Sequence, residues 1–130
     1  MHVPNASAEI DAYYAVGKLL YDNDDFCRAA DVFRLVALLD PRRGDAWWAL
    51  GACHEQEGEL ETAAAMYETG FHLGEQPIDI GLLAARALYR TGERARAQEI
   101  IELLKRERPA TRDERLQSLE REMKEAGSCR

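Results

Sequence analysis

The stretch that decides the fold runs from Gly44 to Pro77, GDAWWALGACHEQEGELETAAAMYETGFHLGEQP. Its apolar residues recur at spacings of three and four on both sides of Gly58, which is typical of helices, whereas strands alternate polar and apolar residues. A glycine between two helices can adopt the positive φ that ends the first one. The stretch therefore predicts two helices joined by a tight turn.

The same pattern recurs on either side, in segments that begin at Ile10 and Ile78 and are also 34 residues long. Each segment has small residues at its eighth and twentieth positions and a large residue at its twenty-fourth. These are Gly17, Gly51 and Ala85; Ala29, Ala63 and Ala97; and Phe33, Tyr67 and Ile101. Two helices approach closely only where side chains are small. We therefore expect the eighth and twentieth positions to face each other, with the large residue beside the crossing. Asp24 takes the place of Gly58 and Gly92 in the first turn.

This pattern resembles the tetratricopeptide repeat family over Ile10 to Thr111, with Pro41 and Pro109 at the thirty-second position. The resemblance implies an all-α fold, a right-handed superhelix with a concave groove. The predicted parts are an N-terminal segment (1–9), three repeats (10–43, 44–77 and 78–111) and a C-terminal region (112–130). The last region holds a predicted amphipathic helix that closes the exposed end of the stack, followed by a short tail.

Composition narrows the class of function. The chain has 130 residues, 46% of them hydrophobic, and a net charge of −7. An acidic protein is a poor candidate for nucleic acid, because such binding depends on neutralising phosphates. The sequence contains no run of 18 apolar residues, so we expect no membrane insertion. Met1–Glu9 shows no signal-peptide pattern. We therefore expect a cytoplasmic protein. Cys27 and Cys53 are expected to serve as small apolar residues in helices.

No catalytic constellation emerges from the sequence. His54-Glu55 begins like the zinc-protease motif H-E-x-x-H, but the fifth position is Gly58, so the second ligand is missing. Phosphate-binding glycine motifs and a nucleophile elbow are absent from the sequence as well. We expect no enzyme activity, no cofactor and no metal.

The first helix of each repeat is expected to line the groove through positions 2, 5, 9, 12 and 13. The candidate peptide-binding residues at these positions are Tyr14, Lys18, Tyr21, Trp48, Ala52, Glu55, Leu82, Arg86 and Tyr89. Exposed aromatic side chains at this density suggest anchors for an apolar peptide. The alternative for Trp48 is packing against a neighbouring repeat. The positions that hold a Lys-Asn-Arg carboxylate clamp in many chaperone adaptors carry no asparagine here, so a C-terminal carboxylate is not the expected ligand.

Several stretches resemble the class II chaperones of bacterial type III secretion, which hold translocator proteins before export. They are Val32–Asp40, Trp48–Cys53, Ala64–Gly70 with Pro77, and Gly92-Glu93 followed by Ala95 and Ala97. The resemblance implies a non-catalytic chaperone that holds an extended apolar segment of a translocator client in its groove, with a homodimer possible. The alternative is a generic scaffold that joins folded proteins. The first predicts a peptide in the groove, whereas the second can use the convex face or the last helix.

Overall fold

The computed structural model describes residues 6–73, 78–107 and 114–128, so Pro77, Pro109 and Cys129 lie outside the described part. The described residues form seven helices and no strand, which confirms the all-α prediction. The helices are α1 (Ala6–Asp22), α2 (Phe26–Leu39), α3 (Gly44–Gln56), α4 (Leu60–Phe71), α5 (Ile78–Arg90), α6 (Arg94–Glu107) and α7 (Glu114–Ser128).

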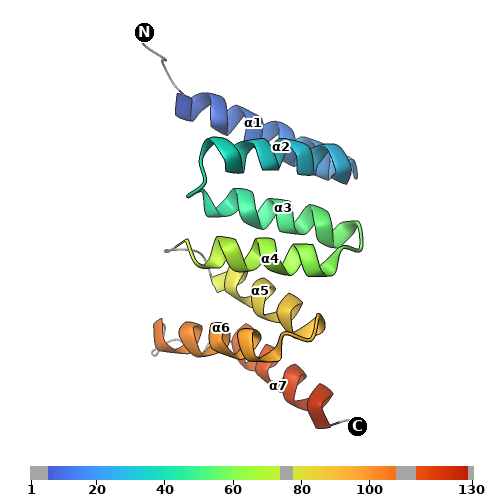
Figure 1. Ribbon diagram of the computed structural model, residues 1–130, viewed down its shortest axis with the longest axis vertical. Helices are drawn as coiled ribbons and strands as arrows, with labels where there is room; N and C mark the ends of the chain where they lie inside the picture. The colour runs from blue at the N-terminus through green and yellow to red at the C-terminus, as the bar shows by residue number, and fades with distance from the viewer. Residues whose placement is uncertain (1–5, 74–77, 108–113, 129–130) are drawn as a thin grey trace.

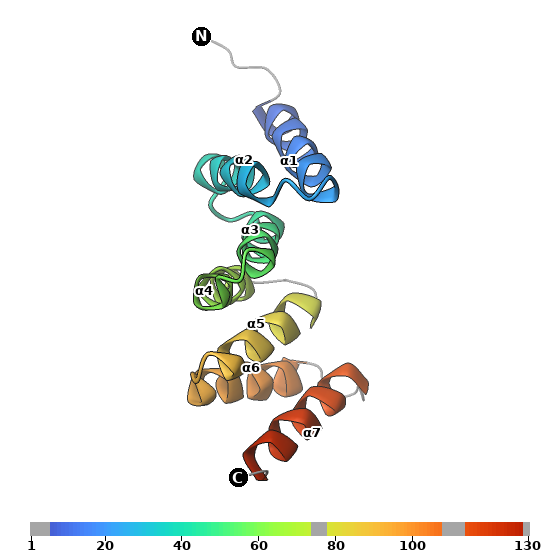
Figure 2. The ribbon, with the colours of Figure 1, turned by 90° about the vertical axis from the view of Figure 1, so that its right-hand side faces the viewer.

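The helices stack along one axis, and each of the first six packs on its neighbour in sequence (Figure 1). Seen from the side, α2 and α4 lie on one edge of the stack, and α1 and α3 lie beside them (Figure 2). The first helices of successive repeats therefore follow one another along one side of the molecule, as a repeat stack requires. α3 and α5 begin at the first residues of the predicted second and third repeats. α1 begins at Ala6, four residues before Ile10.

The turn inside each repeat has the left-handed residue that the sequence predicts. The backbone φ is 61° at Asp24, 78° at Gly58 and 90° at Gly92. Nothing lies within 4 Å of the place where a Cβ would stand at either glycine, so backbone conformation rather than space favours glycine there. Asp24 is tolerated because aspartate is among the few non-glycine residues that adopt this conformation.

The small residues allow close packing, but against a different partner from the one expected. A Cβ added to Gly17 would lie 2.5 Å from the ring of Phe33, and one added to Gly51 would lie 2.6 Å from the ring of Tyr67. The atoms nearest these glycines thus belong to the twenty-fourth position, not to the alanine at the twentieth. Ala29 and the alanines equivalent to it are fully buried. The ring lies against the glycine because the missing side chain leaves room for a flat aromatic face.

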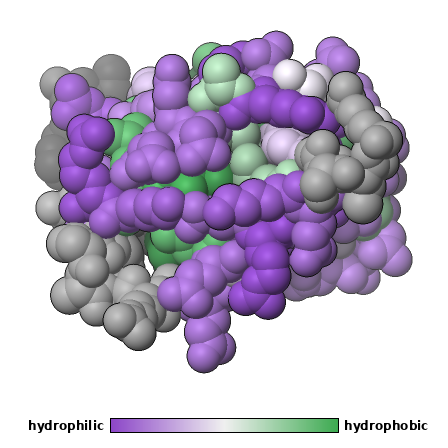
Figure 3. Space-filling model, turned by 90° about the horizontal axis from the view of Figure 1, so that it is seen from below, coloured by the Kyte–Doolittle hydropathy of each residue, from purple (hydrophilic) through white to green (hydrophobic). Residues whose placement is uncertain are grey.

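The C-terminal end of the stack is closed by α7. Leu116 and Leu119 are buried in the same core cluster as α5 and α6, and Met123 packs against it. Hydrophilic side chains cover most of this end, with a smaller apolar area between them (Figure 3). Among the described residues, no helix is both long and apolar enough to cross a membrane.

The two described cysteines differ. Cys53 is fully buried between the first two repeats, as expected for a small apolar residue. Burial raises the pKa of its thiol to about 11. Cys27 is exposed, which corrects the expectation that it serves as an apolar packing residue. It lies near the start of α2.

Candidate peptide-binding groove

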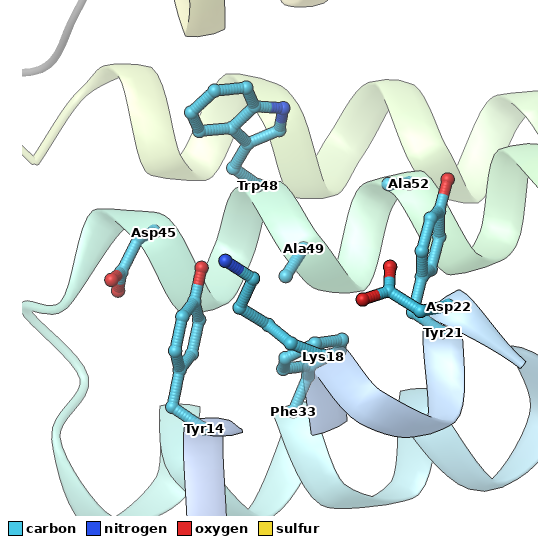
Figure 4. Close-up of a pocket in the computed structure, with 9 residues that line it drawn as sticks. All are labelled: Tyr14, Lys18, Tyr21, Asp22, Phe33, Asp45, Trp48, Ala49 and Ala52. Atoms are coloured by element: carbon cyan, nitrogen blue, oxygen red, sulfur yellow. The ribbon is translucent and has the colours of Figure 1, made fainter. Parts of the chain in front are cut away.

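A pocket of about 360 Å³ lies between α1 and α3, on the side formed by the first helices. Its lining comprises Tyr14, Lys18, Tyr21, Asp22, Phe33, Asp45, Trp48, Ala49 and Ala52 (Figure 4). Five of these were predicted to bind peptide: Tyr14, Lys18, Tyr21, Trp48 and Ala52. The structure therefore brings the predicted residues of the first two repeats together in one cavity. Ala49 and Ala52 have small side chains, which leave room in the pocket for a side chain of a bound peptide.

Aromatic rings form the walls of this pocket. Tyr14 and Tyr21 rise from α1, and Trp48 stands opposite on α3 (Figure 4). The Tyr14 ring packs on Phe33, with the ring centroids 5.5 Å apart. Trp48 is half-buried and also packs against the core cluster of the second and third repeats. The packing alternative for Trp48 is confirmed in part, since the ring contacts the neighbouring repeat. The same ring lines the pocket, so its peptide-binding role stays a prediction.

The pocket carries charges of both signs. The ammonium group of Lys18 projects between Tyr14 and Trp48, while the Asp22 carboxylate lies beside Tyr21 (Figure 4). Burial raises the pKa of the Tyr14 hydroxyl, and the nearby Asp45 carboxylate adds to that rise. The walls are thus apolar, with hydrogen-bonding groups at the rim, as in sites that bind a chain by its side chains and backbone together.

Arg43 ties the two helices together at one end of the pocket. Its Nη1 donates to Asp11 Oδ1 of α1 at 2.6 Å, and its Nε donates to Asp45 Oδ1 of α3 at 2.8 Å. The guanidinium carbon also lies 4.6 Å from the centre of the Tyr14 ring. The hydrogen bond to Asp45 is the main reason that the pKa of Arg43 is raised. Sequence analysis missed this residue, since it precedes α3 and falls outside the groove positions.

A second tie lies at the other end, where Gln56 Nε2 donates to the Tyr21 hydroxyl at 3.3 Å. Glu55, predicted to bind peptide, accepts a hydrogen bond from the Tyr67 hydroxyl at 2.9 Å instead. It lines none of the described pockets. Burial and this hydrogen bond both raise the pKa of Tyr67.

The candidates of the third repeat do not join the first pocket. Leu82 and Arg86 line a second cavity, of about 470 Å³, between α5 and α7. Arg86 Nη2 lies 3.4 Å from Glu122 Oε2, and Arg86 Nε is buried with no hydrogen-bond partner in the described part of the chain. Tyr89 faces a third cavity, and its hydroxyl donates to the Met123 carbonyl at 2.9 Å. The groove is therefore divided, and α7 occupies its C-terminal part.

Sequence reasoning missed Phe33 and Ala49 in the first pocket. In the second it missed Leu83 and the α7 residues Glu114, Arg115, Ser118 and Leu119. Phe33 was assigned to the space between helices, and its ring edge reaches the pocket floor because Gly17 beside it has no side chain. The α7 residues come from a helix outside the repeat pattern, so no repeat position predicts them.

The described residues contain no cluster of three or more His, Cys, Asp or Glu side chains suited to a metal ion. His54 Nδ1 lies 3.2 Å from Glu59 Oε1, across the turn between α3 and α4. That pairing accounts for the motif fragment His54-Glu55 without a ligand role.

Comparison with known proteins places the fold. No protein-family model matches the chain, and no curated protein matches its sequence. Among solved structures, the translocator chaperone SycD of Yersinia enterocolitica type III secretion superposes with a TM-score of 0.78 at 21% identity, covering 97% of this chain and 99% of SycD. SycD in complex with a peptide of the translocator YopD gives 0.77 at 23% identity, covering 96% and 99%. PcrH in complex with the chaperone-binding region of PopB gives 0.73 at 20% identity, covering 94% and 99%.

These likenesses extend over nearly the whole chain, so the fold is that of the helical-repeat chaperones of type III secretion. The prediction of a tetratricopeptide-like architecture is confirmed at the level of the fold.

Proposed function

We propose that the protein is a cytoplasmic, non-catalytic chaperone that holds an extended apolar segment of a secreted translocator in the pocket between α1 and α3. The observation that carries this proposal is the pocket itself, walled by Tyr14, Tyr21 and Trp48 over a low alanine floor. Aromatic anchors around a concave apolar site are the usual basis of peptide recognition. The solved relatives SycD and PcrH were crystallised with segments of YopD, PopB and PopD, which supports the same class of client.

The physics of such a client agrees with the site. A translocator that will enter a membrane exposes apolar surface beforehand, and a chaperone covers that surface until export. The net charge of −7 keeps the carrier in solution while it is loaded.

The test is affinity purification of the protein from its native host, where it is produced at low abundance. Mass spectrometry then identifies the proteins that co-purify with it. We expect one secreted apolar protein, lost in Trp48→Ala and kept in Ala65→Ser, a matched change on an exposed α4 residue. Recovery of several folded cytosolic proteins, retained equally by both variants, would favour the scaffold function instead.

We further propose that the chaperone forms a homodimer through the exposed apolar residues of the first repeat. Tyr13, Val16 and Leu19 of α1 are exposed, and Leu19 is 63% exposed. One repeat later, Leu50 and Cys53 stand in the places of Val16 and Leu19 and are buried, because α2 covers them. In the described part of the chain, no helix covers the equivalent face of α1.

The second helix of the same repeat supplies a complementary feature. Leu35, Leu38 and Leu39 are exposed on α2, with Leu38 at 74%, whereas Thr69 and His72 hold the places of Leu35 and Leu38 in the second repeat. In a two-fold dimer, these leucines of each copy can cover the α1 face of the other, so one patch serves both sides. The solved SycD structure described as an alternative dimer supports such an assembly.

Sedimentation equilibrium decides the dimer proposal. We expect a dimer that Leu19→Glu or Leu38→Glu converts to a monomer with unchanged helicity, while Ala65→Glu leaves the dimer intact. A monomer in the parent protein, or a dimer that withstands both leucine changes, would contradict the assignment of this face.

A further inference from the structure

We infer that Arg43 is a positioning residue for the client pocket, which it controls by fixing the separation of α1 and α3. This inference rests on the proposed peptide-binding function. Arg43 does not line the pocket, and its side chain is 20% exposed. It nevertheless contacts groups on both walls: Asp11 and Tyr14 on α1, and Asp45 on α3.

The pocket walls have little else to hold them in register. α1 packs mainly on α2, and α3 packs mainly on α4 and then on α2, whereas α1 and α3 contact each other directly at few places. The hydrogen bonds that join the two helices in the described part of the chain lie at the ends of the pocket, at Arg43–Asp11 and Gln56–Tyr21. The Gln56 bond is a neutral one at 3.3 Å, whereas the Arg43 bonds are charge-assisted and shorter, so Arg43 makes the stronger tie.

A similar contact between arginine and aspartate occurs at the second cavity, between α5 and α7. The second residue of every repeat is aspartate: Asp11, Asp45 and Asp79. Arg43 holds the first two, and Arg115 of α7 holds Asp79. The second cavity is lined by Asp79 and Arg115 themselves. The first and second cavities therefore each lie beside an arginine that reaches across to the aspartate of the neighbouring helix, whereas Tyr89 of α5 lines a third cavity.

Chemistry explains why arginine suits this place. Its planar guanidinium can bond two carboxylates along different edges while one face lies over an aromatic ring, and lysine offers neither the fork nor the stacking surface. The contact with the Tyr14 ring fixes the side chain that forms one pocket wall. Without the guanidinium, Asp11 and Asp45 would face each other with uncompensated negative charge, which pushes the two walls apart.

The binding test uses three probes: the YopD peptide and the PopB and PopD regions found in the solved complexes. The probe that binds the parent protein most tightly is kept. Arg43→Gln should raise its Kd about tenfold, and Arg43→Lys should give an intermediate value. Asp11→Asn is the sharper variant, because it leaves Arg43 and its bond to Asp45 in place. It should raise Kd about threefold by severing only the α1 arm of the tie.

The matched control is Asp31→Asn, which removes an equal charge and the exposed ion pair to Arg34 within α2. It should leave Kd unchanged. In a Trp48→Ala background the effect of Arg43→Gln should shrink, because both changes act on the same pocket. A role in stability alone would lower the unfolding midpoint without changing Kd at 25 °C or coupling to Trp48.

A second measurement needs no client. Spin labels at Ala15→Cys on α1 and Glu57→Cys after α3, in a chain without its native cysteines, report the distance between the two walls. Arg43→Gln should broaden and lengthen the distance distribution, while Asp31→Asn should not. An unchanged distribution overturns the inference. If no probe binds the parent protein but the distribution changes, the proposed client class fails while the tie stands; if a probe binds equally to parent and Arg43→Gln, the reverse holds.

Discussion

Substituting Gly51 with alanine tests the packing inside a repeat. The new Cβ would stand 2.6 Å from two ring carbons of Tyr67, where carbon atoms normally keep about 3.5–4.0 Å apart. The ring cannot withdraw, because Tyr67 is 2% exposed and its hydroxyl is bonded to Glu55. Overpacking of this kind costs about 1–3 kcal/mol. The higher helix propensity of alanine returns about 1 kcal/mol. Because the ring cannot withdraw, the cost should lie in the upper half of that range, at about 2–3 kcal/mol, so we expect the free energy of unfolding to fall by about 1–2 kcal/mol.

The third repeat supplies the control for this prediction, since it has Ala85 and Ile101 at the equivalent positions. Tyr67→Ile should relieve the clash, so the double variant should be more stable than the sum of the single changes by about 1 kcal/mol or more. Urea unfolding followed by circular dichroism at 222 nm measures all four proteins. Additive effects, or a Gly51→Ala protein as stable as the parent, would refute the close approach of ring and backbone.

Three further predictions concern other contacts. Cys27 should react with a thiol reagent in the folded protein, whereas Cys53 should react only after unfolding, because it is buried and its pKa is raised to about 11; equal rates would contradict the assigned burial. Since the raised pKa favours the neutral thiol in the fold, the free energy of unfolding should be unaffected below about pH 8.5 and should fall as pH rises toward about 11, by no more than about 3 kcal/mol. Cys53→Ala should reduce that slope, and an identical slope would exclude the thiol as its source. Tyr89→Phe removes the hydrogen bond to the Met123 carbonyl, so it should cost about 0.5–1.5 kcal/mol and speed amide hydrogen exchange in α7; unchanged exchange would show that α7 is held by packing alone.

Much of the fold was predictable because the same helix–turn–helix pattern occurs in three successive segments of the sequence. Gly58 and Gly92 mark the turns, and Asp24 takes the same conformation. The pocket was predictable in part, because Tyr14, Lys18 and Trp48 occupy helix positions whose direction follows from the repeat alone.

Other parts depended on contacts that spacing does not encode. Whether Glu55 faces a client or its own Tyr67 depends on the length of the side chain opposite, which sequence position does not reveal. Arg43 lies in a connection between repeats, where no periodicity fixes the direction of a side chain. The division of the groove by α7 depends on how a helix outside the repeat docks, and its apolar stripe of Leu116 and Leu119 does not specify the site.

The central claim is that the pocket between α1 and α3 receives an extended apolar segment. Site-specific photo-crosslinking in the native host tests it most directly, with a photoreactive phenylalanine analogue at Ala52, which lines the pocket, and at Ala65, which is exposed on α4. We predict that Ala52 crosslinks to one short apolar segment of a single secreted protein and that Ala65 does not. Crosslinks of equal yield from both positions, or none from Ala52 while the client still co-purifies, would contradict the account.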